Sequence, residues 1–153
     1  MRALIWLAAL FGTGCSADFW DMNPPTRIEG DPAVLADLQI DRVEVRSAFY
    51  NPPDAFSQAF VPALMARTDA CLGGDRGATA AIFIHELDRR SDLADGGDRL
   101  ILPGSVDVRS GSRVVARLPV RVDVPMPTGD VDARRRAAGD AFGQAICAAL
   151  TRR

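Results

Sequence analysis

Apolar and polar side chains alternate between residues 41 and 49 of the chain. Val43 and Val45 share one parity of this segment, and charged residues occupy the other. A period of two is typical of a strand with one buried face, so this segment is predicted to be the first strand. Pro52-Pro53 has no backbone N–H to donate, and we expect it to follow the end of that strand.

A helical period replaces the alternation after Asp54, which is a good N-cap residue. Gly73-Gly74 supplies a left-handed stop at the far end of this segment. Pro62 lies inside the segment and removes a backbone donor, so we expect it either to kink the helix or to mark its true first turn. The apolar residues of the segment recur near one helical face: Phe56, Phe60, Leu64 and Cys71.

The next three segments are predicted to be strands. Residues 78–87 are apolar on both parities, which suits a central strand covered on both faces. Residues 100–109 and 113–124 are predicted to form a hairpin centred on Gly111, with residue 108 opposite residue 114. This register places the apolar residues of both arms on one side: Val106, Val108, Val114, Ala116, Leu118, Val120, Val122 and Val124.

A second helical period follows the prolines at residues 125 and 127, with Asp130 or Asp132 as its cap. Its apolar stripe is Ala138, Phe142, Ala145, Ile146 and Ala149. The resulting order is β-α-β-β-β-α. We therefore predict an α+β domain with a four-stranded, mostly antiparallel sheet and two helices on one face.

The N-terminus has the order of a secretory signal. Arg2 is followed by an unbroken apolar run from Ala3 to Phe11 and then by small residues. A transmembrane helix needs about 20 apolar residues, so this run is too short to span a bilayer. We predict residues 1–14 to be a signal peptide, residues 15–37 a polar tether, and residues 38–153 a single domain.

The six residues from Leu10 to Cys15, LFGTGC, resemble the lipobox of bacterial lipoproteins. The resemblance implies that the Cys15 thiol is alkylated by diacylglycerol and that cleavage makes this residue the new N-terminus. In such Gram-negative proteins an aspartate after the cysteine favours retention in the inner membrane, so Ser16 favours the periplasmic face of the outer membrane. Cleavage after Ala17 also satisfies the small-x-small rule and would instead release a free periplasmic domain.

The lipobox, the tether and the β-α-β-β-β-α order together are similar to the small Gram-negative envelope lipoproteins that serve as accessory subunits. These include the lipopolysaccharide-assembly lipoprotein and the auxiliary lipoproteins of ABC-type transporters. The segments YNPPD at 50–54 and VRSGSRV at 108–114, with the alanine-rich last helix, also resemble uncharacterised alphaproteobacterial lipoproteins.

This resemblance implies a non-catalytic interaction module, anchored to the membrane by lipid, with an envelope protein as its partner. Two other functions stay open. A carrier or sensor of lipid or another small ligand requires an apolar cavity of about 300 Å³ or more. An enzyme requires a cleft with at least two convergent polar groups, which we do not expect.

Composition limits the classes of function. A chain of 153 residues with 48% hydrophobic side chains is the size of one globular domain. Its formal net charge is −2, so it lacks the basic excess with which proteins bind nucleic acid. We expect no nucleic-acid partner.

Two cysteines, Cys71 and Cys147, remain after Cys15 is assigned to the anchor. The two predicted helices follow strands of the same direction, so both cysteines fall near helix C-termini at one end of the domain. Gly139 and Gly143 precede Cys147 at intervals of four and would let the helices approach closely. In an oxidising compartment this pair can form a disulfide; two buried free thiols are the alternative.

Residues for catalysis, metal binding or cofactor binding are not evident. His85 is the single histidine, and we interpret it as a structural residue of the central strand. Asp88, Asp92, Asp95 and Asp98 could offer oxygen ligands to calcium, but their spacing fails the EF-hand pattern and favours a solvated loop. We therefore predict no catalytic residues, no metal and no cofactor.

A basic stripe is a candidate interaction surface. Arg113, Arg117 and Arg121 are predicted to share the strand face opposite the apolar ladder. Such a stripe could bind a lipid phosphate or an acidic partner. A solvated face is the alternative.

Overall fold

The structure is a computed structural model, and it describes residues 27–47, 52, 54–85, 87, 98–125 and 130–151. Cys15 and residues 88–97 of the aspartate-rich loop lie outside the described residues, as does the predicted signal peptide. The described elements are α1 (Pro32–Ala36), β1 (Leu38–Ser47), α2 (Asp54–Asp69), β2 (Arg76–Ile84), β3 (Arg99–Ser110), β4 (Arg113–Pro125) and α3 (Val131–Leu150).

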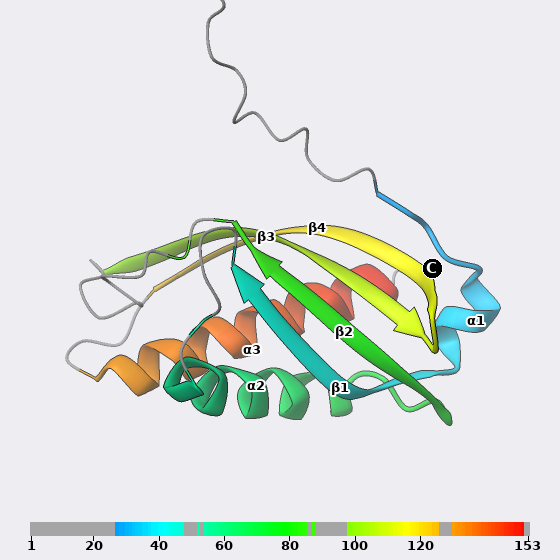
Figure 1. Cartoon of the computed structure of the whole chain (residues 1–153), viewed down its shortest axis with the longest axis horizontal. Coiled ribbons are helices and arrows are strands. Elements are labelled where there is room, and N and C mark those ends of the chain that lie inside the picture. Colours follow the sequence, from blue (N-terminus) through cyan, green and yellow to red (C-terminus); the bar gives the residue numbers. More distant parts are fainter. Residues whose placement is uncertain are drawn as a thin grey trace, which may run out of the picture.

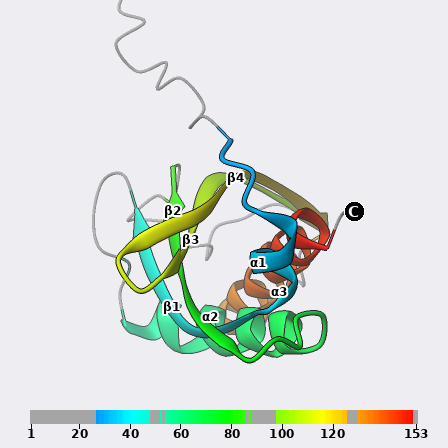
Figure 2. The same ribbon diagram turned by 90° about the vertical axis from the view of Figure 1, so that its right-hand side faces the viewer.

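The strands form one sheet in the order β1-β2-β3-β4. β1 and β2 are parallel, whereas β3 is antiparallel to both β2 and β4. The two long helices, α2 and α3, lie next to each other against one face of this sheet (Figure 1), and the view in Figure 2 shows the same layers from the end. The predicted α+β class, element order and mostly antiparallel sheet are confirmed, with the short helix α1 as an addition before β1.

The core lies between the helix pair and the even-numbered residues of β2, β3 and β4. Phe60 is fully buried at its centre, with its ring centroid 5.1 Å from that of Phe56 and 5.6 Å from that of Phe142. Burying a side chain of this size contributes about 1.5–3 kcal/mol relative to leaving it exposed. The alternation of the strands and the helical period of α2 and α3 therefore meet in one apolar layer.

The close approach of α2 and α3 depends on glycine. A Cβ atom on Gly139 would overlap the carbonyl oxygen of Phe60, and one on Gly143 would crowd Arg67. Arg67 also makes two hydrogen bonds to Asp140, of 2.8 and 3.0 Å, across the helix pair. The long helices begin at the predicted residues. α2 begins eight residues before Pro62, so of the two alternatives for this proline the structure excludes the first turn and places it inside the helix.

The β3–β4 hairpin differs from its predicted register. Gly111, with φ of +60°, and the next residue form a two-residue turn between Ser110 and Arg113. That turn pairs Arg109 with Val114, so Val114 lies on the open side of the sheet rather than in the predicted apolar ladder. A bulge at residue 115 then restores the pairing of even residues, so residue 108 lies opposite 116 rather than 114. Beyond the bulge, the apolar sides of the two arms both face the core.

The central strand is covered on one face only. β2 buries Ala80 and Ile82 under the helices, whereas Ala81 and Phe83 on its other face are partly exposed. The prediction that this strand is covered on both faces is therefore wrong for the described part of the chain. His85 lies just beyond the end of β2 rather than inside the strand, and its ring packs edge-on against Phe83 with centroids 5.3 Å apart.

Candidate functional site

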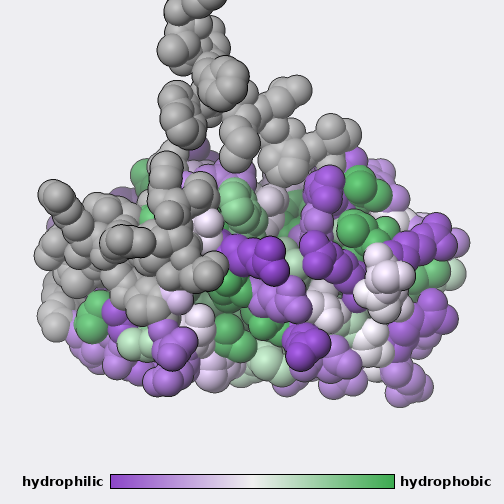
Figure 3. All heavy atoms as spheres, in the orientation of Figure 1, coloured by the Kyte–Doolittle hydropathy of each residue, from purple (hydrophilic) through white to green (hydrophobic). Residues whose placement is uncertain are grey.

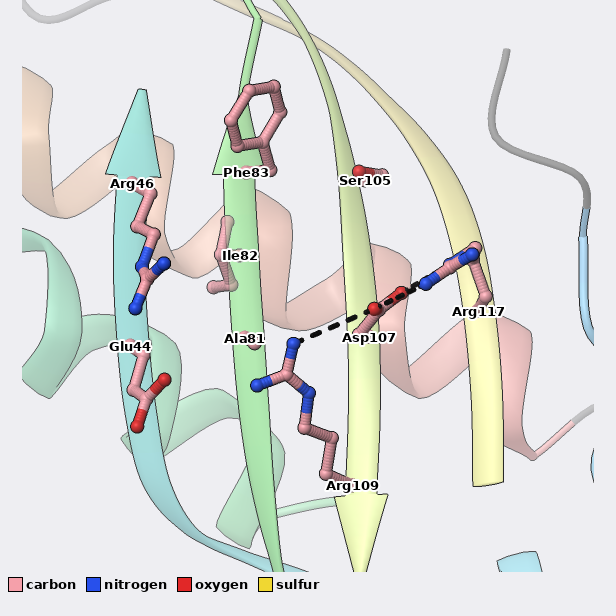
Figure 4. Close-up of a pocket in the computed structure, with 9 residues that line it drawn as sticks. All are labelled: Glu44, Arg46, Ala81, Ile82, Phe83, Ser105, Asp107, Arg109 and Arg117. Atoms are coloured by element: carbon pink, nitrogen blue, oxygen red, sulfur yellow. Dashed lines mark hydrogen bonds and ion pairs between the residues drawn. The ribbon is translucent and has the colours of Figure 1, made fainter. Parts of the chain in front are cut away.

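The face of the sheet opposite the helices holds a cluster of charged and apolar side chains. β1 contributes Glu44 and Arg46, β2 contributes Ala81, Ile82 and Phe83, and β3 and β4 contribute the rest (Figure 4). Together they surround a pocket of about 330 Å³. Its lining residues are Glu44, Arg46, Ala81, Ile82, Phe83, Ser105, Asp107, Arg109 and Arg117.

The shape of this pocket follows from residue size along the strands. Ala81 and Ser105 have short side chains and form its floor, while longer side chains rise on either side (Figure 4). Because β2 is apolar on both parities, its open face supplies Ala81 and Phe83 where a solvated strand would have polar residues. The pocket thus has an apolar floor and a charged rim.

Asp107 interacts with both arginines on the β3–β4 side of the pocket. Arg117 donates two hydrogen bonds to its carboxylate, of 2.6 and 2.7 Å, and the Arg109 guanidinium lies 3.8 Å away. The hydrogen bonds from Arg117 lower the pKa of Asp107 despite its partial burial, and Arg109 adds to this effect. Asp107 in turn raises the pKa of Arg117. This carboxylate is therefore shared by two arginines, of which Arg109 is held more loosely.

The electrostatic balance of the pocket differs from that of the whole chain. Three guanidinium groups and two carboxylates line it, which leaves one positive charge in excess, whereas the chain has a formal net charge of −2. Figure 3 shows hydrophobic residues interspersed among hydrophilic ones on the side of the molecule that it presents. The arrangement is suited to binding a group with both an apolar part and a carboxylate.

The predicted arginine stripe is changed by the bulge in β4. Arg117 and Arg121 lie on the open face, opposite Asp107 and Pro103. Arg113 pairs with Ser110 on the far side of the bulge, where the alternation has shifted by one residue, so it does not share that face. Arg117 is also neutralised by Asp107, so the three residues do not form a continuous basic stripe.

The outer edge of β4 is covered by the segment that precedes α1. Ile28 and Arg117 exchange two backbone hydrogen bonds of 3.0 Å each. A Cβ atom on Gly30 would overlap the carbonyl oxygen of Val115, so this position requires glycine for the segment to lie so close to the bulge. Residues 27–37, predicted as part of the tether, therefore pack on the domain.

A groove of about 960 Å³ lies beside this covered edge, where α1 faces the C-terminal ends of α2 and α3 (Figure 2). Its apolar lining includes Leu72, Leu118 and Leu150, and Arg27 and Glu29 stand at its margin as an ion pair of 3.4 Å. The groove exceeds the cavity of about 300 Å³ that a small ligand requires.

Cys71 and Cys147 form a disulfide at the end of the domain where the groove lies, with Cα atoms 6.0 Å apart. Cys71 also lines the groove, so the crosslink holds one wall of it. The close packing of α2 on α3 brings the two thiols together.

Within the residues that the structure describes, no group of three or more histidine, cysteine, aspartate or glutamate residues could hold a metal ion. The same part of the chain contains no helix long and apolar enough to cross a membrane.

Asp107 was missed in the sequence, although its place in the hairpin could have revealed it. It lies between two core valines at 106 and 108, so it must face away from the core, and the hairpin register sets Arg117 opposite it. The predicted register hid this pair because it matched residue 107 with residue 115. The apolar residues on both parities of β2 were a second signal, since one of its faces is open.

No family model and no curated protein matches the chain. A candidate lipoprotein from Caulobacter crescentus is among the solved structures that resemble it, with 11% identity and a TM-score of 0.42 over 80% of this chain and 96% of that one. An uncharacterised protein matches with 9% identity and a TM-score of 0.38 over 71% and 86% of the two chains. Likeness at this level does not establish a common fold.

Proposed function

We propose that the protein is a lipid-anchored, non-catalytic module of the bacterial envelope, which docks a partner protein through the open face of its sheet. The observation that supports this most directly is the second apolar face of β2, which no described helix or strand covers, with its pocket at Ala81 and Phe83. Protein interfaces commonly combine a small apolar anchor site with a polar rim. The domain would act as an accessory subunit of an envelope assembly or transport complex.

The charges of the rim define the chemistry of the partner. Arg46 on β1 and Arg109 on β3 line opposite sides of the pocket, with Ala81 between them (Figure 4). The one carboxylate near Arg109 is already bound by Arg117 through both oxygens. We expect the partner to insert an apolar side chain onto Ala81 and a neighbouring carboxylate beside Arg109, since guanidinium groups bind carboxylates bidentately.

Site-specific photo-crosslinking in intact envelopes tests this docking. A photo-reactive residue at position 105, on the pocket floor, should give one discrete adduct, and Arg109→Glu should reduce its yield about tenfold or more. A reactive residue at Gln144, exposed on α3, is the matched control and should give no such adduct. Reversing an acidic residue of the identified partner should restore the adduct with Arg109→Glu. Equal adducts from both positions, or an adduct insensitive to Arg109→Glu, would contradict the proposed docking face.

Lipid anchoring at Cys15 has its own test. The mass of the mature protein should equal that of a chain beginning at Cys15 plus its acyl groups, and Cys15→Ala should move the protein from the membrane fraction to the soluble periplasm. Because Ser16 follows the cysteine, the anchored form should sediment with outer membranes. A product that begins at Asp18 without acyl groups would replace this assignment with a free periplasmic domain.

The groove favours a second candidate function, the carriage of a single acyl chain. Its apolar walls suit a hydrocarbon, and Arg27 at the margin could bind an anionic head group. A fluorescent C16 fatty acid should bind the purified chain, and Ala36→Trp, which fills the groove from α1, should abolish that binding. Ala66→Trp, on the exposed face of α2, is the control. Equal binding by both variants would exclude the groove as the site.

A further inference from the structure

No strand of the described residues pairs with the outer edge of β1, and we propose that this edge pairs with β1 of a second copy of the chain. An edge strand directs alternate backbone N–H and C=O groups outward, where they can pair with another strand. Residues 42–47 of β1 follow β2 in unbroken register and so form a regular template. The pairing would join two sheets into one continuous sheet.

The side chains of β1 differ between its two faces. Arg42, Glu44 and Arg46 lie on the open face, opposite Thr79, Ala81 and Phe83 of β2. Val43 and Val45 face the core but are only partly buried. A strand placed beside β1 would cover these two valines and extend the apolar layer.

Charge complementarity identifies the occupant as a second copy. In an antiparallel pair with its two-fold axis at Val45, Glu44 of each copy lies opposite Arg46 of the other. Two ion pairs of opposite charge then form on the open face, and the two copies of Val45 meet on the core side. Edge strands that resist association commonly carry charged side chains, especially lysine. In β1 the charges alternate in sign, so two copies of the strand are complementary when they pair in antiparallel orientation.

The charges and the bulge at Asp41 together select one register. An axis at Glu44 would place Glu44 against itself and Arg42 against Arg46, so like charges would face each other at each of these pairs on the open face. An axis at Val43 would also pair Glu44 with Arg42, but it would place Val45 opposite Asp41, where β1 has a bulge relative to β2. The axis at Val45 uses only residues beyond that bulge.

Sedimentation of the purified full chain, with charge reversals, tests the dimer. A contact this short buries less than a standard interface, so we expect a dissociation constant between about 1 µM and 1 mM. Glu44→Arg and Arg46→Glu should each weaken the dimer by about tenfold or more, because each places two like-charged pairs at the interface. Glu29→Arg, an exposed charge reversal outside β1, should leave it unchanged.

The decisive step is to mix the two weakened variants. In the mixed dimer one strand carries arginine at both positions and the other carries glutamate at both, so each cross-strand pair again joins opposite charges. The mixture should associate as well as or better than the natural chain, although neither variant does so alone. The double variant Glu44→Arg/Arg46→Glu should also regain self-association. A chain that is monomeric throughout this range, single variants that associate normally, or a mixture without recovery would each overturn the proposal.

This test is independent of the docking proposal. It uses one purified protein and measures its mass, whereas docking is measured by a crosslink from position 105 to a different protein. Thermal unfolding of each variant separates a loss of association from a loss of folding.

Discussion

The two edge strands of the sheet, β1 and β4, differ in whether another described segment of the chain covers them. The outer edge of β4 is covered where Ile28 exchanges hydrogen bonds with Arg117, and Pro119 further along has no N–H to offer. The outer edge of β1 has no such cover among the described residues and bears alternating charges instead. One edge is therefore covered by the N-terminal segment, while no described residue pairs with the other.

Both edge strands contain a bulge, at Asp41 in β1 and at Val115 in β4. In each case a glycine lies against the bulge, but the contact is of a different kind. Gly30 lies against the backbone carbonyl of Val115, which has no freedom to move without the strand. Gly77 lies against the side-chain carboxylate of Asp41, which can rotate. The glycine at the β4 bulge is therefore packed against backbone, whereas the glycine at the β1 bulge is packed against a side chain.

The largest loss of unfolding free energy is expected on removal of the disulfide beside the covered edge. Replacing Cys71 and Cys147 together by serine removes a crosslink that closes a loop of 76 residues. The chain-entropy model places the loss at about 4 kcal/mol of unfolding free energy. Urea unfolding of the variant and of the natural chain, both without reductant, measures it. An unchanged midpoint would show that the crosslink adds nothing to the α2–α3 packing.

Gly30→Ala should cause the next largest loss of stability. Its Cβ atom would overlap the Val115 carbonyl oxygen and crowd Leu35, so the segment before α1 must shift away from β4. Overpacking of this kind costs about 1–3 kcal/mol. Faster hydrogen exchange of the Arg117 amide would show that the edge has opened. Exchange at the natural rate would mean that the segment tolerates the added methyl group.

Asp107→Asn tests the ion pair on the open face. Asp107 accepts charged hydrogen bonds from Arg117, so its replacement should cost about 1–2 kcal/mol at neutral pH. Because folding lowers the pKa of Asp107, its stabilisation is present above the unfolded value of about 3.9 and is lost as the pH falls through the folded value. The difference between variant and natural chain should therefore shrink below about pH 4.

Asp123→Asn is the control for this measurement. Asp123 pairs with Arg99, but the side chains of both residues are about half exposed, at 48% and 61%. An exposed pair contributes at most about 1 kcal/mol. A pH dependence as large as that of Asp107→Asn would contradict a special role for the open-face pair.

Gly77→Ala should have the smallest effect and completes the comparison of the edges. The Asp41 side chain can rotate away from an added methyl group, so the change in stability should lie within about 0.5 kcal/mol. Thermal unfolding beside Gly30→Ala measures both edges in one experiment. Equal losses would show that the two glycines are under the same constraint.

The β3–β4 hairpin shows that the local sequence pattern predicts which side of a strand is buried but not the register between strands. The valines of both arms predict which side faces the core, and the structure buries Val106, Val108 and Val122 there. The two-residue turn and the bulge each shift the pairing by one residue in the same direction, and a total shift of two residues leaves the same face buried. For this reason the pairing of Asp107 with Arg117 was not predicted.

β2 shows that the apolar pattern of a strand does not predict what covers each of its faces. Apolar residues on both parities indicate that both faces are shielded, but they do not reveal by what. The helices shield Ala80 and Ile82, whereas no described helix or strand covers Ala81 and Phe83, which are partly exposed.

The sequence by itself determined the order of the four strands and two long helices, the buried side of those helices and of the hairpin strands beyond the bulge, and the small residues at which α2 and α3 approach. These features depend on periods of two and 3.6 residues, which are local properties of the chain. Tertiary structure alone decided which face of β2 is open, which edge the N-terminal segment closes, and which charges meet across β3 and β4. Those outcomes depend on contacts between distant segments, and a bulge of a single residue is enough to change them.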